Sequence, residues 1–319
     1  MKVSIIIPTW NGKALLEKNL PFLFKSIRLS HYPVEVIIVD DGGEDDSQKF
    51  LVERFPQVKL IVHQKNKGFS AACLSGVKAA QGEVVILLNN DVTVCNNFID
   101  PLISHFKKED TFSVSPLVLD EKGHVSSVSL RIPYLRRGKM KFQKTEEAIS
   151  SPRYTLFGSG GSVAYSRKKF LLLGGFNPLY SPFYLEDREL GLRAWRRGWK
   201  SYLEPRAKVI HPKGQTINNR FQRKFISQVK QRNEIIFSFN NVLNNRVLIT
   251  GVVFPLLMKL LYKWINLHFD YYFSFFSALR FLPEIQRQRK EEKKSMVLNE
   301  EEIFKIIKGS TPEINNQRI

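Results

Sequence analysis

Three short apolar runs, rich in β-branched residues, limit most strongly how this chain can fold. They occupy residues 3–7 (VSIII), 35–39 (EVIIV) and 84–88 (VVILL), and such continuous runs are typical of strands buried on both faces of a sheet. Between the first two runs, the apolar residues of 15–27 follow one face of a helix. Two more helices and one strand are expected at 47–55, 70–80 and 59–62. Strands that alternate with helices predict an α/β fold with a mostly parallel central sheet flanked by helices.

Polar residues follow each of these runs directly. PTWNG at 8–12, DDGG at 40–43 and NND at 89–91 stand where the three predicted strands end. Each motif alone is ordinary turn or cap chemistry. Ligands of open α/β sheets bind beyond the carboxyl ends of the strands, however, and acidic groups gathered there repel one another unless a cation or ligand offsets their charge. Together the three motifs predict a ligand site.

A larger set of fragments makes the sequence recognisable. In chain order the fragments are SIIIPTWNG (4–12), VIIVDDGGEDDS (36–47), NKGFSAACLSG (66–76), GEVVILLNNDV (82–92), GSGGSVAYSRKKFLLLGGFN (158–177), FYLEDRELGLRAWRRGW (183–199) and His211. The set resembles the inverting glycosyltransferases of family 2, and most closely their rhamnosyltransferase-like bacterial members. The match covers roughly residues 1–215. It implies the GT-A (nucleotide-diphospho-sugar transferase) fold, with a nucleotide-binding half at 1–91 and an acceptor half at 92–215.

The resemblance assigns the nucleotide of a nucleoside-diphosphate sugar to residues at the strand ends and at one helix start. They are Pro8, Thr9, Asn11, Asp41, Asn66, Gly68 and Asn90. Asp41 is expected to hydrogen-bond the base or the ribose, ahead of Asp40, which suits a turn. Asn66 and Gly68 open a predicted helix whose amides are expected to face the donor phosphates, although a simple helix start is the alternative.

The NND motif stands where the family has its metal motif, and only its last residue, Asp91, is a carboxylate. The resemblance therefore implies Asp91 as the ligand of a divalent metal, Mn or Mg, with His211 as a second ligand. A structural role for His211 stays open, and an imidazole ligand favours Mn. The metal is expected to stabilise the negative charge on the departing nucleoside diphosphate.

Glu186 and Asp187 stand near the start of a predicted helix, where acidic residues are often only partners of the helix dipole. The resemblance assigns the general base to Asp187, which takes the proton of the acceptor hydroxyl, and places Glu186 beside it. It assigns Gly160 and Gly161 to the acceptor side, where Trp199 is expected either to line a sugar site or to build the core. Residues 120–155 match none of these motifs, and their basic side chains predict either a loop over phosphates or a solvated loop.

The C-terminal third has a different composition. Of the net charge of +19, residues 212–319 contribute 18 basic and 9 acidic side chains, which predicts an anionic partner. Residues 247–258 are apolar except for Thr250, but Lys259 and Lys263 follow at once, so a simple membrane span of ~20 residues is disfavoured. The aromatic residues of 264–281, set among basic ones, predict helices that lie in an anionic membrane interface. Packing on the catalytic domain or in a dimer is the alternative.

We therefore expect a helical, aromatic and basic region at 216–294 that associates with a membrane or packs on protein, followed by a polar tail at 295–319 with one short helix. Cys73 and Cys95 are the two cysteines and exclude a disulfide framework, which indicates a reducing compartment. The first ten residues lack the apolar run of a signal peptide. These features predict a protein on the cytoplasmic face of the cell membrane, bound peripherally.

The expected function is metal-dependent, inverting transfer of a sugar from a nucleoside-diphosphate sugar to a hydroxyl of a glycan acceptor, for which a lipid-linked glycan is favoured. Transfer to a polyprenyl phosphate is an alternative. A nucleic-acid-binding protein would also suit the charge, but the sequence contains no nucleic-acid motif, so no nucleic-acid partner is expected. An inert nucleotide-sugar binder is disfavoured because Asp91 and Asp187 are both present.

Overall fold

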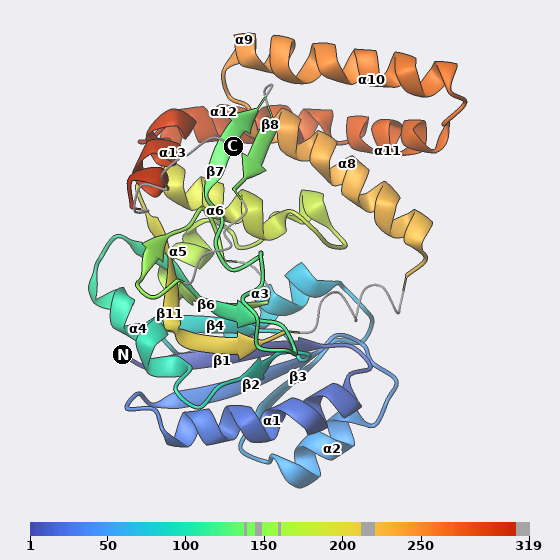
Figure 1. Cartoon of the computed structure of the whole chain (residues 1–319). Helices are drawn as coiled ribbons and strands as arrows, with labels where there is room; N and C mark the ends of the chain where they lie inside the picture. The colour runs from blue at the N-terminus through green and yellow to red at the C-terminus, as the bar shows by residue number, and fades with distance from the viewer. Residues whose placement is uncertain (137–138, 144–148, 159–160, 212–220, 311–319) are drawn as a thin grey trace.

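The computed structural model describes residues 1–136, 139–143, 149–158, 161–211 and 221–310 (Figure 1). A nine-stranded sheet lies at the centre, in the order β3-β2-β1-β4-β10-β6-β11-β5, with β9 paired to β11. The strands are β1 (Val3–Thr9), β2 (Val34–Asp40), β3 (Lys59–Val62), β4 (Val84–Leu88), β5 (Thr93–Val94), β6 (Thr111–Leu119), β9 (Arg153–Tyr154), β10 (Ser162–Ser166) and β11 (Lys200–Ile210). A separate hairpin consists of β7 (Pro133–Arg136) and β8 (Lys139–Phe142).

The strand directions explain where a ligand site can form. β1, β2, β3 and β4 pair in parallel, and so do β6 and β11. β10 runs antiparallel between β4 and β6, so β6 and β11 point the same way as β1. The predicted mostly parallel sheet is confirmed, and the carboxyl ends of β1, β2, β4 and β11 lie at one edge.

Helices cover both faces of this sheet and continue beyond it. They are α1 (Lys13–Arg28), α2 (Ser47–Arg54), α3 (Phe69–Ala79), α4 (Ile99–Ser104), α5 (Arg167–Leu172), α6 (Glu186–Arg196), α8 (Arg223–Asn241), α9 (Asn245–Leu248), α10 (Phe254–Ile265), α11 (Asp270–Leu279), α12 (Leu282–Ser295) and α13 (Glu300–Gly309), with short helices at η1 (His105–Lys107), η2 (Pro178–Tyr180) and η3 (Ile249–Val253). The predicted helices at 15–27, 47–55 and 70–80 are confirmed as α1, α2 and α3, with ends shifted by at most two residues.

Alternation along β1 divides the core of the sheet into two layers. Ile5 and Ile7 pack with Leu16 of α1 on one face, whereas Ile6 packs with Ala72 of α3 on the other. All five side chains are at most 2% exposed. Because successive strand residues point to opposite faces, a continuous apolar run fills both layers, which explains why the predicted strands lack a polar face.

The C-terminal helices begin as an extension of the same core. Trp195 of α6 is fully buried and belongs to one apolar cluster with Ile285 of α12 and with Ile303 and Ile307 of α13. Residues 300–309 of the predicted polar tail therefore form a helix that packs on the catalytic part. Figure 1 shows α8, α12 and α13 stacked on the side of the sheet away from α1 and α2.

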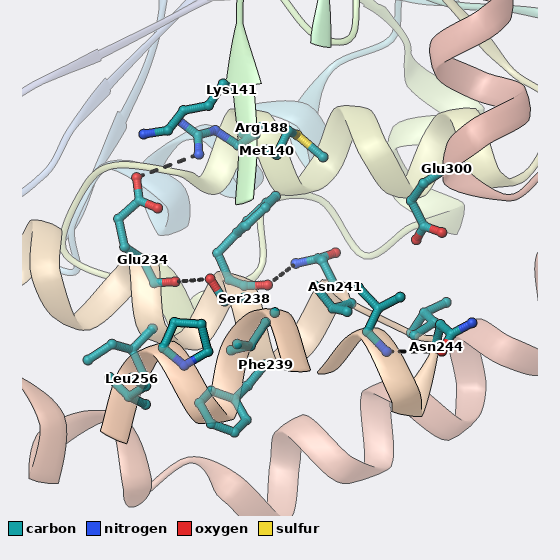
Figure 2. Close-up of a pocket in the computed structure, with 18 of the residues that line it drawn as sticks. Met140, Lys141, Arg188, Glu234, Ser238, Phe239, Asn241, Asn244, Leu256 and Glu300 are labelled. Atoms are coloured by element: carbon teal, nitrogen blue, oxygen red, sulfur yellow. Dashed lines mark hydrogen bonds and ion pairs between the residues drawn. The ribbon is translucent and has the colours of Figure 1, made fainter. Parts of the chain in front are cut away.

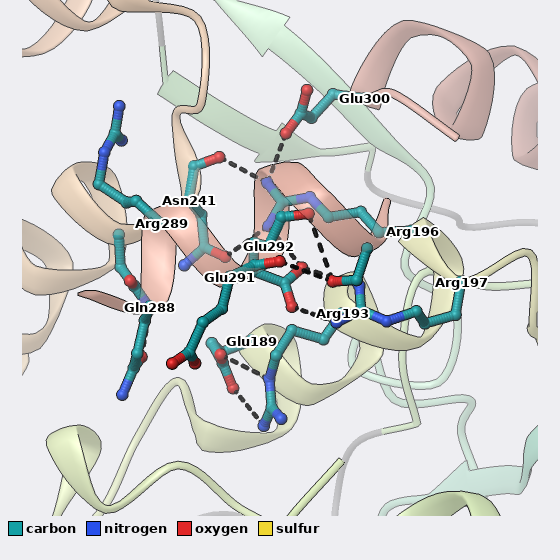
Figure 3. A network of polar contacts seen from close by, with 12 residues as sticks. Glu189, Arg193, Arg196, Arg197, Asn241, Gln288, Arg289, Glu291, Glu292 and Glu300 are labelled. Carbon is teal, nitrogen blue, oxygen red and sulfur yellow. Dashed lines mark hydrogen bonds and ion pairs between the residues drawn. The ribbon is translucent and has the colours of Figure 1, made fainter. Parts of the chain in front are cut away.

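A buried arginine reinforces this packing (Figure 3). Arg196 of α6 is fully buried and donates to the carbonyl of Asn241 at 2.6 Å. Its guanidinium also pairs with Glu300 and lies 3.6 Å from Glu292, which accepts from Arg197 at 2.7 Å. Because a buried guanidinium is stable only with partners, these contacts tie α8, α12 and α13 to α6.

The outer helices α9 to α11 differ, because they expose their apolar side chains. On Val247, Ile249, Phe254, Leu257, Met258, Leu261, Tyr262, Trp264, Ile265, Leu267, Phe269, Phe273 and Phe276, between 38% and 73% of the surface is exposed. In the described part of the chain, Asn245–Ile265 is the one helical stretch that is long and apolar enough to cross a membrane, with a mean hydropathy of 1.6. We call the thirteen exposed side chains the apolar surface.

Candidate active site

The polar residues after β1 and β4 are in direct contact. The Nδ2 of Asn90 donates to the Oγ1 of Thr9 at 2.9 Å, and the backbone amide of Asp41 donates to the carbonyl of Thr9 at 2.8 Å. Pro8 pairs with Val39 in the register of β1 and β2. The predicted nucleotide residues of the first, second and fourth strands therefore meet at one edge of the sheet.

Two residues after β1 shape this edge. A Cβ atom at Gly12 would lie 2.3 Å from the side chains of both Asn90 and Thr9, so only glycine fits there. Asn11 has a φ of 49°, a left-handed conformation that asparagine tolerates. Its side-chain oxygen accepts from the amide of Glu44 at 2.6 Å. Asn11 thus connects the loop after β1 to the loop after β2.

Asp41 holds the loop that leads into α3. Its carboxylate accepts from the backbone amides of Lys67 at 2.9 Å and Gly68 at 2.8 Å, and its Oδ1 lies 2.6 Å from the Nδ1 of His63. Only 4% of Asp41 is exposed, whereas Asn66 in the same loop is exposed. Asp41 therefore fixes the start of α3, where the phosphate-facing amides are predicted.

Gly68 and Asp40 complete this part of the site. Gly68 has a φ of +88° and stands directly before α3, and an added Cβ would meet no atom within 4 Å. The space beside this helix start is thus open to a ligand. Asp40, which is fully buried, accepts from the amide of Gly43 at 3.0 Å and from Gln48 at 2.7 Å. Its contacts are those of a turn residue.

His63 is a functional candidate that the sequence analysis missed. It follows β3 directly, and its Nε2 lies 3.0 Å from the Oγ of Ser75 in α3 while its Nδ1 contacts Asp41. The sequence contained a signal for His63, because this polar residue directly follows the strand predicted at 59–62. His63 therefore helps to orient the carboxylate of Asp41.

The two predicted metal ligands lie side by side. The Oδ1 of Asp91, after β4, is 3.3 Å from the Nε2 of His211, after β11, and the two side chains are 9% and 19% exposed. Among the described residues, no group of three or more His, Cys, Asp or Glu side chains could hold a metal ion. One carboxylate and one imidazole fit a divalent metal that takes its other ligands from substrate and water.

Asn19 of α1 holds the loop that carries Asp91. This residue is 7% exposed, and its Nδ2 donates to the carbonyl of Asn90 at 2.9 Å while its Oδ1 accepts from the Oγ1 of Thr93 at 2.6 Å. Sequence reasoning missed Asn19, although a polar side chain on the apolar stripe of a predicted helix is a usable signal. Its two hydrogen bonds fix Asp91 between Asn90 and Thr93.

Two of the three residues predicted for the acceptor side are described. The carbonyl of Gly161 accepts from the amide of Asn89 at 2.6 Å, and a Cβ at Gly161 would lie 2.2 Å from the Asn89 side chain. Gly161 thus lies against the loop of Asp91. Gly160 lies outside the described residues.

The structure does not bring Trp199 to this edge. Trp199 stands before β11, whose 11 residues end near His211, so the two residues lie roughly 35 Å apart along the strand. The indole stacks on Phe112 with ring centres 6.2 Å apart, and the ammonium of Lys169 lies 5.5 Å from its centre. Trp199 therefore packs near the opposite end of β11, so the structure does not bring it together with the other predicted site residues.

Glu186 and Asp187 form the first turn of α6, after an unusual backbone. Tyr184 and Leu185 have φ values of 75° and 77°, which for non-glycine residues cost about 1–2 kcal/mol each. Strained backbone of this kind persists where surrounding contacts hold it, and it often marks a functional site. Here the holding contacts come from α8.

Asn233 of α8 supplies these contacts. It is fully buried, and its Nδ2 donates to the carbonyls of Tyr180, Phe183 and Tyr184 at 2.8, 2.9 and 2.9 Å. Its neighbour Arg232 donates to the carbonyl of Ser181. One residue of the C-terminal region thus fixes the turn directly before the predicted base, and no local sequence pattern indicates this.

The environment of the carboxyl pair disfavours its ionised form. Burial, with the charge of Asp187, raises the pKa of Glu186 to about 8. Burial also raises the pKa of Asp187, while the charges of Arg188 and Arg131 oppose this increase. The Oε2 of Glu186 is buried without a hydrogen-bond partner. A carboxylate with a raised pKa accepts a proton readily near neutral pH, as a general base must.

The buried thiol of Cys73 is influenced by charges from both this carboxyl pair and the predicted nucleotide residues. Burial raises the pKa of Cys73 in α3, and the charges of Glu186 and Asp41 raise it further. Both acids are therefore within electrostatic range of one side chain. The arrangement can place a donor along the strand ends and an acceptor hydroxyl at Asp187.

Comparison with known proteins identifies the family. The model of "Glycosyl transferase family 2" matches residues 4–172, more than half of the chain. The chain belongs to glycosyltransferase family 2. It is 28% identical over 238 residues to the N-acetylglucosaminyl-diphospho-decaprenol L-rhamnosyltransferase of Mycobacterium tuberculosis, with 66% of this chain and 76% of that relative covered. The predicted rhamnosyltransferase-like resemblance is confirmed.

Solved structures confirm the fold of this glycosyltransferase. The mannosyltransferase from Pyrobaculum calidifontis in complex with GDP-Man and Mn2+ is 15% identical, with 87% of each chain covered and a TM-score of 0.54. TarS from S. aureus in complex with UDP-GlcNAc is 16% identical, with 76% of this chain and 67% of that chain covered and a TM-score of 0.52. The predicted GT-A fold is confirmed, with helices added at its C-terminal end.

Proposed function

We propose that this glycosyltransferase transfers a sugar, with inversion, from a nucleoside-diphosphate sugar to a hydroxyl of a lipid-linked glycan. The observation that carries the proposal is the 3.3 Å contact between Asp91 and His211 at the edge where Thr9, Asn90 and Asp41 also meet. The carboxylate of Asp91, the imidazole of His211 and the polar groups at the strand ends suit the binding of a metal-bound diphosphate.

The donor is proposed to bind along this edge. Asp41 orients the loop before α3, and the amides after Gly68 face the phosphates, where a helix start favours negative charge. Asp91 and His211 would hold a divalent metal, Mn2+ or Mg2+, which neutralises charge on the leaving diphosphate when bound. The mannosyltransferase with the same fold is in complex with GDP-Man and Mn2+, which supports this choice.

Asp187 is proposed to act as the general base. As the acceptor oxygen attacks the anomeric carbon, the carboxylate of Asp187 takes its proton, and the bond to the diphosphate breaks on the opposite face. The result is inversion at that carbon. Glu186, whose pKa is raised to about 8, stays largely protonated at neutral pH and can donate a hydrogen bond to the acceptor.

The lipid-linked acceptor is supported by two separate observations. The mycobacterial relative is named for an acceptor that carries N-acetylglucosamine on diphospho-decaprenol. The apolar surface on α9 to α11 is accompanied by basic residues such as Lys259 and Lys263, and such a combination binds anionic membrane interfaces. We therefore propose that the enzyme works peripherally at the cytoplasmic face of the membrane, in polysaccharide synthesis of the cell envelope.

The direct test is a transfer assay. The purified chain is incubated with Mn2+, a panel of nucleoside-diphosphate sugars that begins with an activated L-rhamnose, and N-acetylglucosaminyl-diphospho-polyprenol in detergent. Mass spectrometry is expected to detect one added sugar, and NMR of the product an inverted anomeric carbon. Transfer to polyprenyl phosphate alone would favour the second acceptor class, and the absence of transfer from every donor would contradict the proposal.

A further inference from the structure

A cavity of about 820 Å³ lies outside the donor edge, between the β7–β8 hairpin, α8, α10 and α13 (Figure 2). This volume is within the range of small-molecule sites. Its apolar lining includes Phe142, Phe237 and Leu256, which come from three separate elements. Nothing in the donor site described above uses this cavity.

Basic side chains are the main charged groups of the cavity. Its lining contains five of them, Lys141, Arg188, Lys230, Lys259 and Lys293, against three acidic ones, Glu234, Glu300 and Glu301. Glu300 already pairs with buried Arg196, and Glu234 lies 3.6 Å from Arg188. Apolar walls with an excess of positive charge suit a ligand that is both apolar and anionic.

Two arginines lie beside the Phe142 ring, and one of them, Arg188, lines the cavity. The guanidinium of Arg188 lies 5.0 Å from the ring centre of Phe142, and that of Arg131 lies 5.7 Å from the same ring. The Nε atoms of both are buried without a hydrogen-bond partner. Arg188 is adjacent in sequence to Asp187 at the start of α6. Two partly buried guanidinium groups beside one aromatic ring, each with an Nε that lacks a hydrogen-bond partner, suit the binding of a phosphate.

The other end of the cavity continues to the apolar surface. Leu256 of α10 lines the cavity, whereas the next residue, Leu257, is 57% exposed on the outer side of the same helix. A long apolar chain can therefore pass from a membrane interface along α10 toward Arg188. This continuity points to a lipid rather than a small soluble anion.

We propose that this cavity binds the isoprenoid diphosphate part of the lipid-linked acceptor, an inference that rests on the function proposed above. The apolar chain lies between α8 and α10, and the phosphates contact Arg188 and Arg131. The sugar beyond the phosphates then lies at Asp187. The cavity thus selects acceptors by their lipid diphosphate, independently of the donor.

Binding of soluble analogues tests this proposal. Isothermal titration calorimetry on the full chain, with saturating nucleoside diphosphate and Mn2+ in the donor site, compares farnesyl diphosphate, farnesol and inorganic diphosphate. Farnesyl diphosphate is expected to bind at least about tenfold more tightly than either part alone, equivalent to ~1.4 kcal/mol. Absence of farnesyl diphosphate binding while the nucleotide saturates the donor site, with binding when the nucleotide is left out, would assign it to the donor site and overturn the proposal.

Two substitutions separate the apolar and anionic contributions. Leu256→Trp fills the cavity and is expected to weaken farnesyl diphosphate about tenfold without affecting inorganic diphosphate. Leu172→Trp, at a 67% exposed position on α5, is the control without effect. Arg188→Gln is expected to weaken both diphosphates. Unchanged farnesyl diphosphate binding in either cavity variant, with Leu172→Trp also unchanged, would overturn the proposal.

Failure of this inference is distinguishable from failure of the proposed function. Nucleotide binding with Mn2+ is measured in every variant and reports on the donor site and on correct folding. If Leu256→Trp does not fold, Lys230→Gln replaces it, because Lys230 lines the cavity at an exposed position. Intact nucleotide binding with unchanged lipid affinity would refute the cavity alone, and loss of nucleotide binding in the wild type would refute the donor site.

Discussion

The sheet edge buries polar side chains, whereas the C-terminal helices α9 to α11 expose apolar ones. At the sheet edge, Asp41, Asn90 and Asp91 are largely buried polar groups with defined partners. On α9 to α11, side chains such as Ile265 are apolar and 70% exposed. The buried polar groups hold one another in fixed positions, whereas the exposed apolar side chains form a surface for contact. Under the proposed function, the first region carries the reaction and the second gives access to the acceptor.

Asn233 connects the two regions, which makes the comparison testable. It belongs to α8, the first helix of the described part of the C-terminal region, yet it holds the turn before Asp187. The two regions are therefore expected to respond differently to substitution, except where α8 contacts α6.

The largest expected effect is at Asp187, the proposed base. Asp187→Asn removes the proton acceptor but keeps the size of the side chain, so kcat is expected to fall about 10²–10⁴-fold. The nucleotide affinity stays unchanged. Asp46→Asn is the control, because Asp46 is 75% exposed after β2. Transfer rates and nucleotide titrations measure both, and near-normal kcat in Asp187→Asn would remove Asp187 from the role of base.

The next effect concerns the connection between the regions. Asn233→Ala leaves three carbonyls before α6 without their donor, which costs about 1–3 kcal/mol of stability and misplaces Asp187. We expect kcat to fall about tenfold or more, with the nucleotide dissociation constant unchanged.

Asn240→Ala is the matched control for this prediction. Asn240 is buried on the same helix but donates to Gln288 of α12 at 3.1 Å instead. It is expected to lower the melting temperature without a similar loss of kcat. Equal loss of kcat in both variants would show that general destabilisation, rather than the turn, explains the result.

A smaller effect is expected at the apolar surface. Ile265→Glu places a charge where membrane contact is proposed, and binding to anionic vesicles is expected to weaken about tenfold, as the loss of ~1–2 kcal/mol of apolar burial implies. Leu172→Glu is the control, since Leu172 is 67% exposed on α5. Vesicle sedimentation measures both. Equal binding in the two variants would contradict a membrane role for α9 to α11.

The smallest effect is a change in the pH dependence of stability. The pKa of Glu186 is raised from its usual value of 4.5 to about 8 in the folded chain. The folded chain is therefore expected to lose stability as the pH rises from about 4.5 toward 8. Glu186→Gln is expected to match the wild type near pH 4 and to be more stable than the wild type at pH 8, because the amide does not ionise.

Thermal unfolding across this pH range checks the prediction. Glu53→Gln, at an exposed position on α2, serves as the control and is expected to follow the wild type. A Glu186→Gln curve parallel to that of the wild type would show that Glu186 is not a buried acid with a raised pKa.

The sequence predicted the sheet edge well because strand ends are local features. A β-branched run followed by polar residues located Asp41 and Asp91, and the same rule applied to β3 would have found His63. The place of Trp199 could not be decided from the sequence, because a motif does not show at which end of a strand its residues lie. β11 separates Trp199 from His211 by its whole length.

The C-terminal helices were less predictable because their partners are distant in sequence. Asn233 bonds residues 49 to 53 positions earlier, and Arg196 pairs with Glu300 more than 100 positions later. Buried Ile303 and exposed Ile265 have the same residue type, so composition cannot separate packing helices from surface helices. Only the tertiary contacts distinguish them.

The most direct test of the central claim is thermal stabilisation by nucleotides. UDP, dTDP and GDP are each added with and without Mn2+ to the wild type and to Asp91→Asn. The account predicts that one nucleotide at about 100 times its dissociation constant stabilises the wild type by ~2.7 kcal/mol, and that Mn2+ strengthens this effect only when Asp91 is intact. Equal stabilisation in Asp91→Asn, or none from any nucleotide, would contradict a metal-assisted donor site at this edge.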